Sequence, residues 1–134
     1  MSKYTTISLQ MNDEECIKAA LKECGYKNIE VYTEPQTLYG IGGKARPEKA
    51  HIIVRRAEVG PAANDLGFLK TKNGKYEMFI SEFDKHKLTH GALKNLEQQY
   101  GVHRFKKQIK GMGMGIVSQK TDNKGRVKIK VLAP

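Results

Sequence analysis

The sequence predicts an α+β fold, with an antiparallel sheet and two helices that cover one face of that sheet. Two segments show apolar residues at helical spacing, and the second is long, running from residue 88 to about residue 112. Short, alternating apolar stretches lie between and around these segments and predict strands. The central stretches are joined by Asn73-Gly74, the strongest short-range signal for an antiparallel hairpin. The specific arrangement expected is ferredoxin-like with an inserted hairpin, in one domain spanning residues 1–134.

The first strand and the first helix are predicted near the N-terminus. Residues 3–10 alternate between polar and apolar side chains, as in a strand. Asn12 is the predicted N-cap of the helix, with a glutamate three residues later completing a capping box, and Gly25 is its predicted end. The apolar stripe of this helix contains Ile17, Ala20, Leu21 and Cys24. The second strand is predicted over residues 26–33, and Pro35 is expected to interrupt it.

The middle of the chain is predicted to form further strands around a basic loop. Residues 38–46 are rich in glycine, which indicates a tight turn that needs positive φ angles. The following strands are predicted over residues 50–56, 66–71 and 75–80, with a connecting loop over residues 59–64.

The long helix is the most regular pattern in the chain. Thr89 is its predicted N-cap, Leu88 is expected to pack on Leu93 from outside the first turn, and Gly111 is its predicted end. Apolar residues recur along it at steps of three, four or five: Leu93, Leu96, Tyr100, Phe105, Ile109 and Met112. We expect them to form one buried stripe.

A hairpin is predicted after the long helix. Its strands are expected over residues 116–119 and 126–132, on either side of a turn at residues 122–125. The last strand alternates cleanly, with Val127, Ile129 and Val131 expected inward and the intervening basic residues outward.

Charge is the clearest compositional feature. The chain has 24 basic and 14 acidic residues, a net charge of +10. Residues 103–134 hold only one acid, Asp122, against nine basic residues: Arg104, Lys106, Lys107, Lys110, Lys120, Lys124, Arg126, Lys128 and Lys130. A charge this unevenly distributed indicates an anionic partner, such as nucleic acid, an acidic protein surface or a membrane surface.

Composition also indicates the compartment. No apolar run approaches the ~18 residues needed to span a membrane, and no signal-peptide pattern follows Met1, so a cytoplasmic or plastid-stroma location is expected. Cys16 and Cys24 are eight residues apart on a predicted helix, which separates their backbones by roughly 12 Å. That distance exceeds the range for a disulfide, so we expect two reduced thiols, with Cys24 in the core.

The glycine-rich stretches fail the nucleotide-binding motifs that they resemble. Gly43-Lys44 would match a phosphate-binding loop only with a glycine in place of Leu38 and a hydroxyl residue in place of Ala45. The run of alternating glycines at residues 111–115 follows a helix, whereas a dinucleotide fingerprint follows a strand. A tight turn and a helix exit are the simpler interpretations.

The histidines do not form a metal-binding pattern. His86 and His90 are four residues apart, but with Thr89 as the cap His86 lies outside the helix, so the two cannot share a helical face. His51 stands alone in a strand, and His103 is expected to be a packing histidine. We therefore predict no catalytic residue, no metal and no cofactor.

Several motifs together resemble a known family. In order they are Leu38-Tyr39-Gly40, residues 52–55, Asp65-Leu66-Gly67-Phe68, Asn73-Gly74, Tyr76-Glu77, Gln99-Tyr100 with His103, and residues 122–131. This order resembles the hypothetical chloroplast reading frame thirty-five family, also catalogued as domain of unknown function twelve fifty-seven. The resemblance implies a compact α+β domain of cyanobacterial, plastid or phage origin, and it implies no catalytic residues. The basic residues from Arg104 to Lys110 depart from the acidic pattern of that family.

A non-enzymatic, basic binding protein is therefore the predicted function. The first hypothesis is contact with the RNA or DNA backbone at low sequence specificity, and the second is an adaptor or assembly subunit that docks an acidic protein through the same face. A third is an accessory small-ligand site at His103 or the glycine-rich loop. The predicted contact residues are Lys44, Arg46, Arg104, Lys106, Lys107, Lys110, Lys120, Arg126, Lys128 and Lys130.

Overall fold

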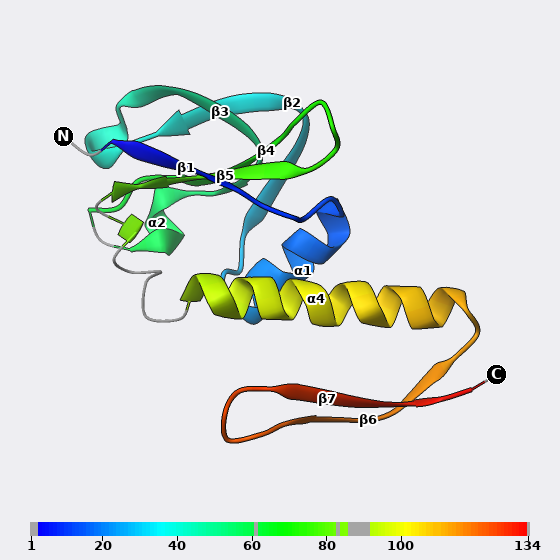
Figure 1. Ribbon diagram of the computed structural model, residues 1–134. Coiled ribbons are helices and arrows are strands. Elements are labelled where there is room, and N and C mark those ends of the chain that lie inside the picture. The colour runs from blue at the N-terminus through cyan, green and yellow to red at the C-terminus, as the bar shows by residue number, and fades with distance from the viewer. Residues whose placement is uncertain (1–2, 61, 83, 86–91, 134) are drawn as a thin grey trace.

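A computed structural model describes residues 3–60, 62–82, 84–85 and 92–133. It confirms the α+β class, with a five-stranded antiparallel sheet in the order β1-β5-β4-β3-β2 (Figure 1). The strands are β1 (Tyr4–Ser8), β2 (Ile29–Tyr39), β3 (Ala45–Val54), β4 (Leu66–Lys70) and β5 (Tyr76–Ser81). A sixth and a seventh strand, β6 (Gly115–Thr121) and β7 (Val127–Leu132), form a separate hairpin.

The strand order differs from the ferredoxin-like arrangement that we expected. In a ferredoxin-like core the two strands joined by the first helix are separated by a single strand, and the first strand lies inside the sheet. Here β1 and β2 lie at opposite edges, with β5, β4 and β3 between them. From β2 to β5, each strand pairs with the next strand along the chain through a short connection. Strand β1 therefore pairs with the remaining free side of β5.

Both helices lie on one side of the sheet, as predicted. Helix α1 (Glu14–Glu23) packs on the sheet, and α4 (Ala92–Gly111) packs across α1 (Figure 1). The hairpin β6–β7 lies along the far side of α4. A short helix, α2 (Arg56–Val59), leaves β3. The main core fills the space between sheet and helices, and its fully buried side chains include Ile17, Leu21, Ile52 and Phe68. Burying each such side chain contributes about 1.5–3 kcal/mol.

The other face of the sheet has a smaller core around Leu38 and Ile53. Gly67 makes this cluster possible, because a β-carbon there would lie 2.7 Å from Ala50 Cβ and 2.9 Å from Leu38 Cδ1. Leu38 therefore packs directly over the backbone of β4.

Local predictions near the N-terminus need two corrections. The N-cap of α1 is Asp13, whose Oδ1 accepts the Cys16 N–H at 3.0 Å, and Asn12 instead interacts with Tyr100. Pro35 does not interrupt β2, because the pairing with β3 shifts register between Val31 and Gln36 and β2 is an edge strand. A proline in an edge strand at a bulge breaks no required hydrogen bond.

Turn predictions based on glycine are confirmed. Gly25 (φ 101°), Gly42 (φ 76°), Gly74 (φ 85°) and Gly125 (φ 80°) adopt positive φ angles at the predicted turns. Both cysteines are free, although Cys16 is the buried one and Cys24 is half-buried. Helix α4 ends at Gly111 as expected. The predicted cap at Thr89, the Leu88 contact and the Leu93 side chain lie outside the described part of the chain.

Helix α4 has two apolar faces instead of the single stripe that we expected. Leu96 and Tyr100 belong to the core shared with α1 and the sheet. Phe105 follows Tyr100 by five residues. At 3.6 residues per turn, its side chain therefore points about 140° around the helix axis from that of Tyr100. Phe105 therefore faces the hairpin with its neighbour Val102, and Phe105 and Met112 remain exposed.

The two faces predict different responses to the same substitution. Leu96→Asp places a charge in a side-chain position that is only 4% exposed, and should lower the free energy of unfolding by more than about 3 kcal/mol. Phe105→Asp, at a position that is 40% exposed, should cost about 1 kcal/mol. Urea titration monitored by circular dichroism measures both, and equal losses would contradict the two-faced helix.

Candidate nucleic-acid interface

Three lysines lie together on the outer face of the hairpin, and we call them the hairpin lysine face: Lys120, Lys128 and Lys130. Lys120 is directly opposite Lys128 in the β6–β7 register, and Lys130 is opposite Ser118. All three lysines are exposed. Like charges directly opposite each other destabilise a strand pair, so this arrangement favours a site that an external anion neutralises.

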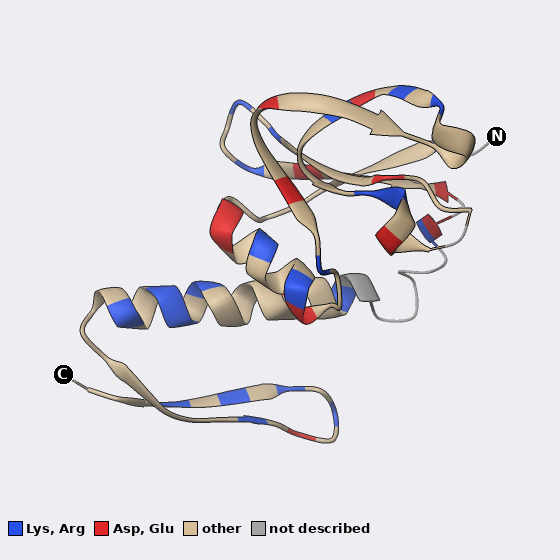
Figure 2. Cartoon of the chain, turned by 180° about the vertical axis from the view of Figure 1, so that it is seen from behind, with Lys and Arg blue, Asp and Glu red and all other residues tan. Residues whose placement is uncertain are grey.

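The alternation of β7 creates this face. Val127, Ile129 and Val131 are half-buried, while Lys128 and Lys130 between them are exposed, as predicted. Figure 2 shows basic residues in blue along the hairpin and on the C-terminal half of α4.

Arg126 belongs to the turn and not to the hairpin lysine face. The Asp122 carboxylate accepts the Lys124 and Arg126 backbone N–H groups and the Arg126 Nε, at 2.9, 2.9 and 2.7 Å. The hydrogen bonds from Arg126 hold the pKa of Asp122 below its ordinary value. The single acid of this segment is thus used to build the turn, with Arg126 as its partner.

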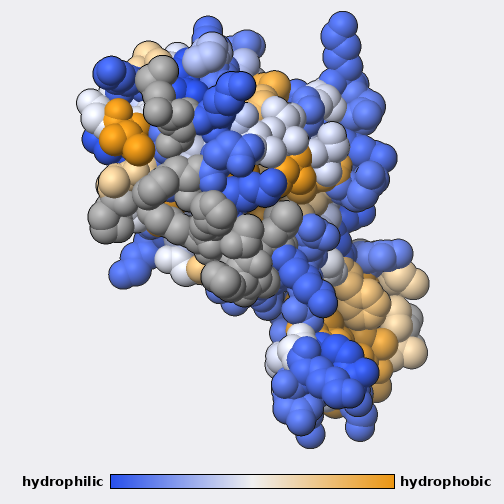
Figure 3. All heavy atoms as spheres, turned by 60° about the vertical axis from the view of Figure 1, so that its left-hand side comes forward, coloured by the Kyte–Doolittle hydropathy of each residue, from blue (hydrophilic) through white to orange (hydrophobic). Residues whose placement is uncertain are grey.

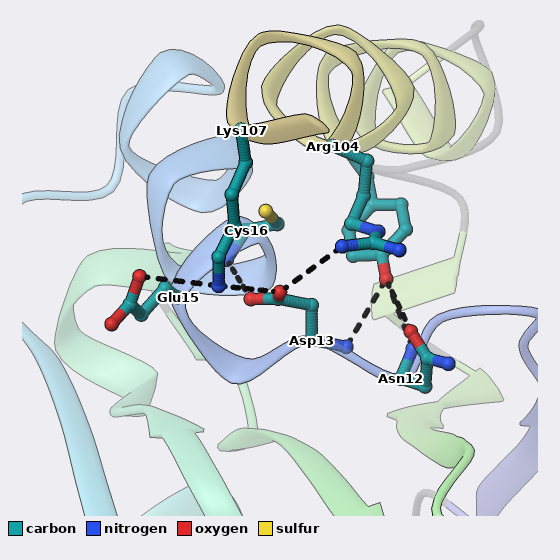
Figure 4. A network of polar contacts seen from close by, with 7 residues as sticks. Asn12, Asp13, Glu15, Cys16, Arg104 and Lys107 are labelled. Atoms are coloured by element: carbon teal, nitrogen blue, oxygen red, sulfur yellow. Dashed lines mark hydrogen bonds and ion pairs between the residues drawn. The ribbon is translucent and has the colours of Figure 1, made fainter. Parts of the chain in front are cut away.

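Two of the predicted contact residues on α4 form internal ion pairs (Figure 4). Lys107 Nζ lies 2.7 Å from Asp13 Oδ2 and 3.4 Å from Glu15 Oε2, and Arg104 Nη1 lies 3.4 Å from Asp13 Oδ2. Burial alone would raise the pKa of Asp13, but the hydrogen bonds from Lys107 and from the Cys16 N–H outweigh it and hold the pKa below its ordinary value. Arg104 and Lys107 therefore join α4 to the N-terminus of α1.

Of the predicted contact residues on α4, Lys106 and Lys110 are the two left open to a ligand. They line a hollow of about 250 Å³ between α1 and α4, together with His103, Lys107, Glu15, Cys16 and Ala19. No ion pair of Lys106 or Lys110 occurs among the described residues. These two lysines supplement the hairpin lysine face from the neighbouring element.

Lys44 and Arg46 do not join the other predicted contact residues. They lie in the turn between β2 and β3, which contains the 3₁₀ helix η1 (Ile41–Gly43), and at the start of β3. Figure 1 shows this turn at the end of the sheet away from the hairpin. The Arg46 guanidinium carbon lies 5.2 Å from the centre of the Tyr4 ring, so Arg46 packs on the first strand. The ten predicted residues thus form separate groups.

His103 and His51 each contact neighbouring elements of the fold. His103 Nε2 lies 3.5 Å from Glu23 Oε1, which is long for a hydrogen bond, and links α4 to the end of α1. His51 Nδ1 accepts the Lys70 backbone N–H at 3.0 Å. His86 and His90 lie outside the described residues. Within the described part, no group of three or more potential ligands gathers around a metal-sized space.

One buried polar cluster was not predicted. Asp65 accepts hydrogen bonds from the Tyr39 and Arg56 backbone N–H groups at 2.7 Å and from Arg55 Nη1 at 2.9 Å. Asn64 donates its side-chain amide to Ser81 Oγ at 3.0 Å. These bonds join β2, the start of α2 and β5 to the loop before β4, which is a structural role. The adjacent polar pair Asn64-Asp65 immediately before an apolar strand was the available signal.

The fold and the site define a small α+β protein with a basic hairpin attached to its second long helix. The chain belongs to the family described as protein of unknown function (DUF1257), whose model matches residues 20–130. No curated protein and no solved structure matches the chain. Among the described residues, no helix is long and apolar enough to cross a membrane.

Asp13 makes the α1–α4 contact sensitive to acid. Its pKa is lowered in the folded state, so it stabilises the fold above its unfolded pKa of about 3.8 and loses this contribution as the pH falls below that value. Asp13→Asn keeps a capping side chain but removes the charge. The free energy of unfolding of this variant should therefore depend less steeply on pH below about 4.

Urea titrations at a series of pH values test this expectation. Glu97→Gln is the matched control, because it removes one carboxylate from α4 at an exposed position that forms no ion pair among the described residues. An unchanged slope in Asp13→Asn would show that Asp13 gains nothing from Lys107.

Proposed function

We propose that this protein binds the phosphate backbone of nucleic acid through the hairpin lysine face, with low sequence specificity. The observation that carries the proposal is the direct opposition of Lys120 and Lys128, with Lys130 two residues further along the same face. Alternate residues on one strand face are about 6.8 Å apart, which is twice the phosphate rise along one strand of B-DNA. The backbone also winds around the helix axis, so neighbouring phosphates on one strand lie further apart than this rise, at roughly 7 Å. Lys128 and Lys130 therefore match neighbouring phosphates.

The low sequence specificity follows from the absence of aromatic side chains on the hairpin lysine face. The exposed outer positions of β6 and β7 carry lysine, serine and aliphatic residues and no aromatic ring. Without stacking side chains or a helix to enter a groove, contacts to phosphate fix position but carry no sequence information. The expected role is a non-enzymatic binding protein.

An adaptor role is the second candidate, favoured by the same unbalanced charge. An acidic protein surface would satisfy the hairpin lysine face as a phosphate backbone does. On either reading, the order of motifs supports a source in a cyanobacterium, a plastid or a phage, with the protein in the cytoplasm or the plastid stroma.

Salt dependence is the direct test of backbone contact. If three hairpin lysines and Lys110 each neutralise one phosphate, the logarithm of the duplex binding constant should fall linearly with the logarithm of salt concentration, with a slope of roughly −3.6. Lys128→Glu with Lys130→Glu should flatten this slope without lowering stability, because both side chains are exposed. Fluorescence anisotropy with a labelled duplex measures the slope.

The matched control places the same charge change elsewhere. Lys44→Glu with Lys49→Glu alters two exposed lysines at the turn and strand β3, on the part of the sheet away from the hairpin, and should leave the slope nearly unchanged. Equal effects of the two double variants would point to net charge alone, and a flat response in the parent protein would favour the adaptor role.

A further inference from the structure

The hollow between α1 and α4 differs in chemistry from a hollow of about 360 Å³ between α4 and β7. The hollow beside β7 is lined mostly by apolar side chains, and Figure 3 shows apolar surface in orange and tan beside the hydrophilic tip of the hairpin. The hollow beside α1 has a volume of about 250 Å³, and α4 contributes four nitrogen-bearing side chains to its lining: His103, Lys106, Lys107 and Lys110. The three lysines follow His103 by three, four and seven residues, so all four lie on one face of the helix.

His103 has a ring nitrogen that the fold buries without satisfying it. Its Nε2 atom is shielded from solvent and makes no hydrogen bond among the described residues. The Glu23 carboxylate lies 3.5 Å from Nε2, which is too long for a good hydrogen bond, and the Glu23 side chain is 53% exposed. A buried polar atom without a partner destabilises the fold, and an acceptor oxygen from a ligand would satisfy it.

Lys106 and Lys110 place two positive charges in the lining of this hollow. Neither lysine forms an ion pair among the described residues, and Lys106 is half-buried. The two lysines are four residues apart on one helix, a spacing at which like charges repel each other. An anion bound between them would relieve this repulsion.

The acids at the start of α1 are already paired. Lys107 Nζ lies 2.7 Å from Asp13 Oδ2 and 3.4 Å from Glu15 Oε2, between the two carboxylates (Figure 4). Arg104 Nη1 also lies 3.4 Å from Asp13 Oδ2, so two cations offset these two acids. Burial raises the pKa of the Cys16 thiol, so the α1 side of the hollow adds no thiolate charge at neutral pH. The charges of the other two lysines in the lining are therefore left for a ligand.

We infer that this hollow binds a phosphate group, as inorganic phosphate or as a phosphate monoester. Phosphate carries a charge of about −2 near neutral pH, which matches the two unpaired lysines, and its oxygens accept hydrogen bonds from several directions. Donors from three side chains are available to it: His103, Lys106 and Lys110. A carboxylate would offer half the charge and two oxygens in one plane. The inference does not depend on nucleic-acid binding by the hairpin lysine face, which contains none of these three residues.

Isothermal titration calorimetry with inorganic phosphate, at an ionic strength held constant with chloride, tests the inference on the full chain. The parent protein should bind one phosphate per chain. Lys106→Gln should weaken this binding about tenfold or more, because it removes a charged donor to the phosphate. Lys94→Gln is the matched control: it removes a lysine charge from an exposed position of α4 outside the lining, and should leave binding nearly unchanged.

Substitutions at His103 separate the hydrogen bond from packing. His103→Leu keeps an apolar side chain on α4 but has no donor, and should weaken phosphate binding about tenfold. His103→Gln restores an N–H donor and should retain most of the affinity. Glu23→Gln acts in the opposite direction, because it removes a negative charge 3.5 Å from His103 Nε2, and should strengthen binding. Melting temperatures without phosphate check that each variant folds.

Further ligands identify the source of the phosphate: glycerol 3-phosphate, and a short single-stranded oligonucleotide with and without a 5′-phosphate. A gain in affinity from the 5′-phosphate that Lys106→Gln abolishes would assign the site to nucleic-acid ends. Binding of glycerol 3-phosphate without such a gain would assign it to a small phosphorylated compound.

Three results would overturn the inference: no phosphate binding by the parent protein, equal weakening in Lys106→Gln and Lys94→Gln, or full binding by a folded His103→Leu. The salt slope of duplex binding in Lys128→Glu with Lys130→Glu reports on the hairpin lysine face, so its outcome is separate from these three.

Discussion

Tyr100 anchors helix α4 on the start of α1 through both its ring and its hydroxyl group. The Tyr100 ring lies in the main core, while its hydroxyl oxygen accepts the Asn12 and Asp13 backbone N–H groups at 3.0 and 3.1 Å. These N–H groups precede the first turn of α1 and would otherwise need water. Two-stranded hairpins are marginally stable alone, so β6–β7 depends on the helix that carries it. The position of the hairpin therefore follows from how α4 packs on α1, and Tyr100 is the residue that fixes this packing to the start of α1.

The positive charge of the C-terminal segment is divided by this architecture. Asp13, the acidic N-cap of α1, stabilises the N-terminus of that helix, and its ion pairs with Arg104 and Lys107 join α1 to α4. Arg126 completes the Asp122 turn. Lys120, Lys128 and Lys130 lie on a surface that makes no comparable internal pairs among the described residues. Basic residues that count equally toward the net charge thus differ in role. The role of each depends on whether the fold places a carboxylate beside it.

Local signals could be predicted from the sequence, and contacts between distant residues could not. Asn73-Gly74, Gly111 and the alternation at Val127–Val131 act within a few residues, and each element was found. The edge position of β1 depends on pairing with β5, whose partner residues are 69 to 77 positions away, and the choice of Asp13 over Asn12 as N-cap depends on Tyr100. For the candidate site, the outward direction of Lys128 and Lys130 was predictable, but the pairing of Lys107 with Asp13 was not. The five-residue step from Tyr100 to Phe105 was visible in the sequence and marks where the apolar face of α4 changes side.

The attachment of the hairpin has a consequence for how the molecule opens. Strands β6 and β7 pair with each other and with no strand of the five-stranded sheet, and their side chains are exposed or half-buried. Segments with few buried apolar contacts open by local unfolding, at a free energy well below that of the whole fold. The amide hydrogens of the hairpin should therefore exchange with solvent through a sub-global opening that leaves the sheet and α1 intact. The protein is in this sense two cooperative units of unequal stability joined by α4, and the less stable unit is the one that carries the hairpin lysine face.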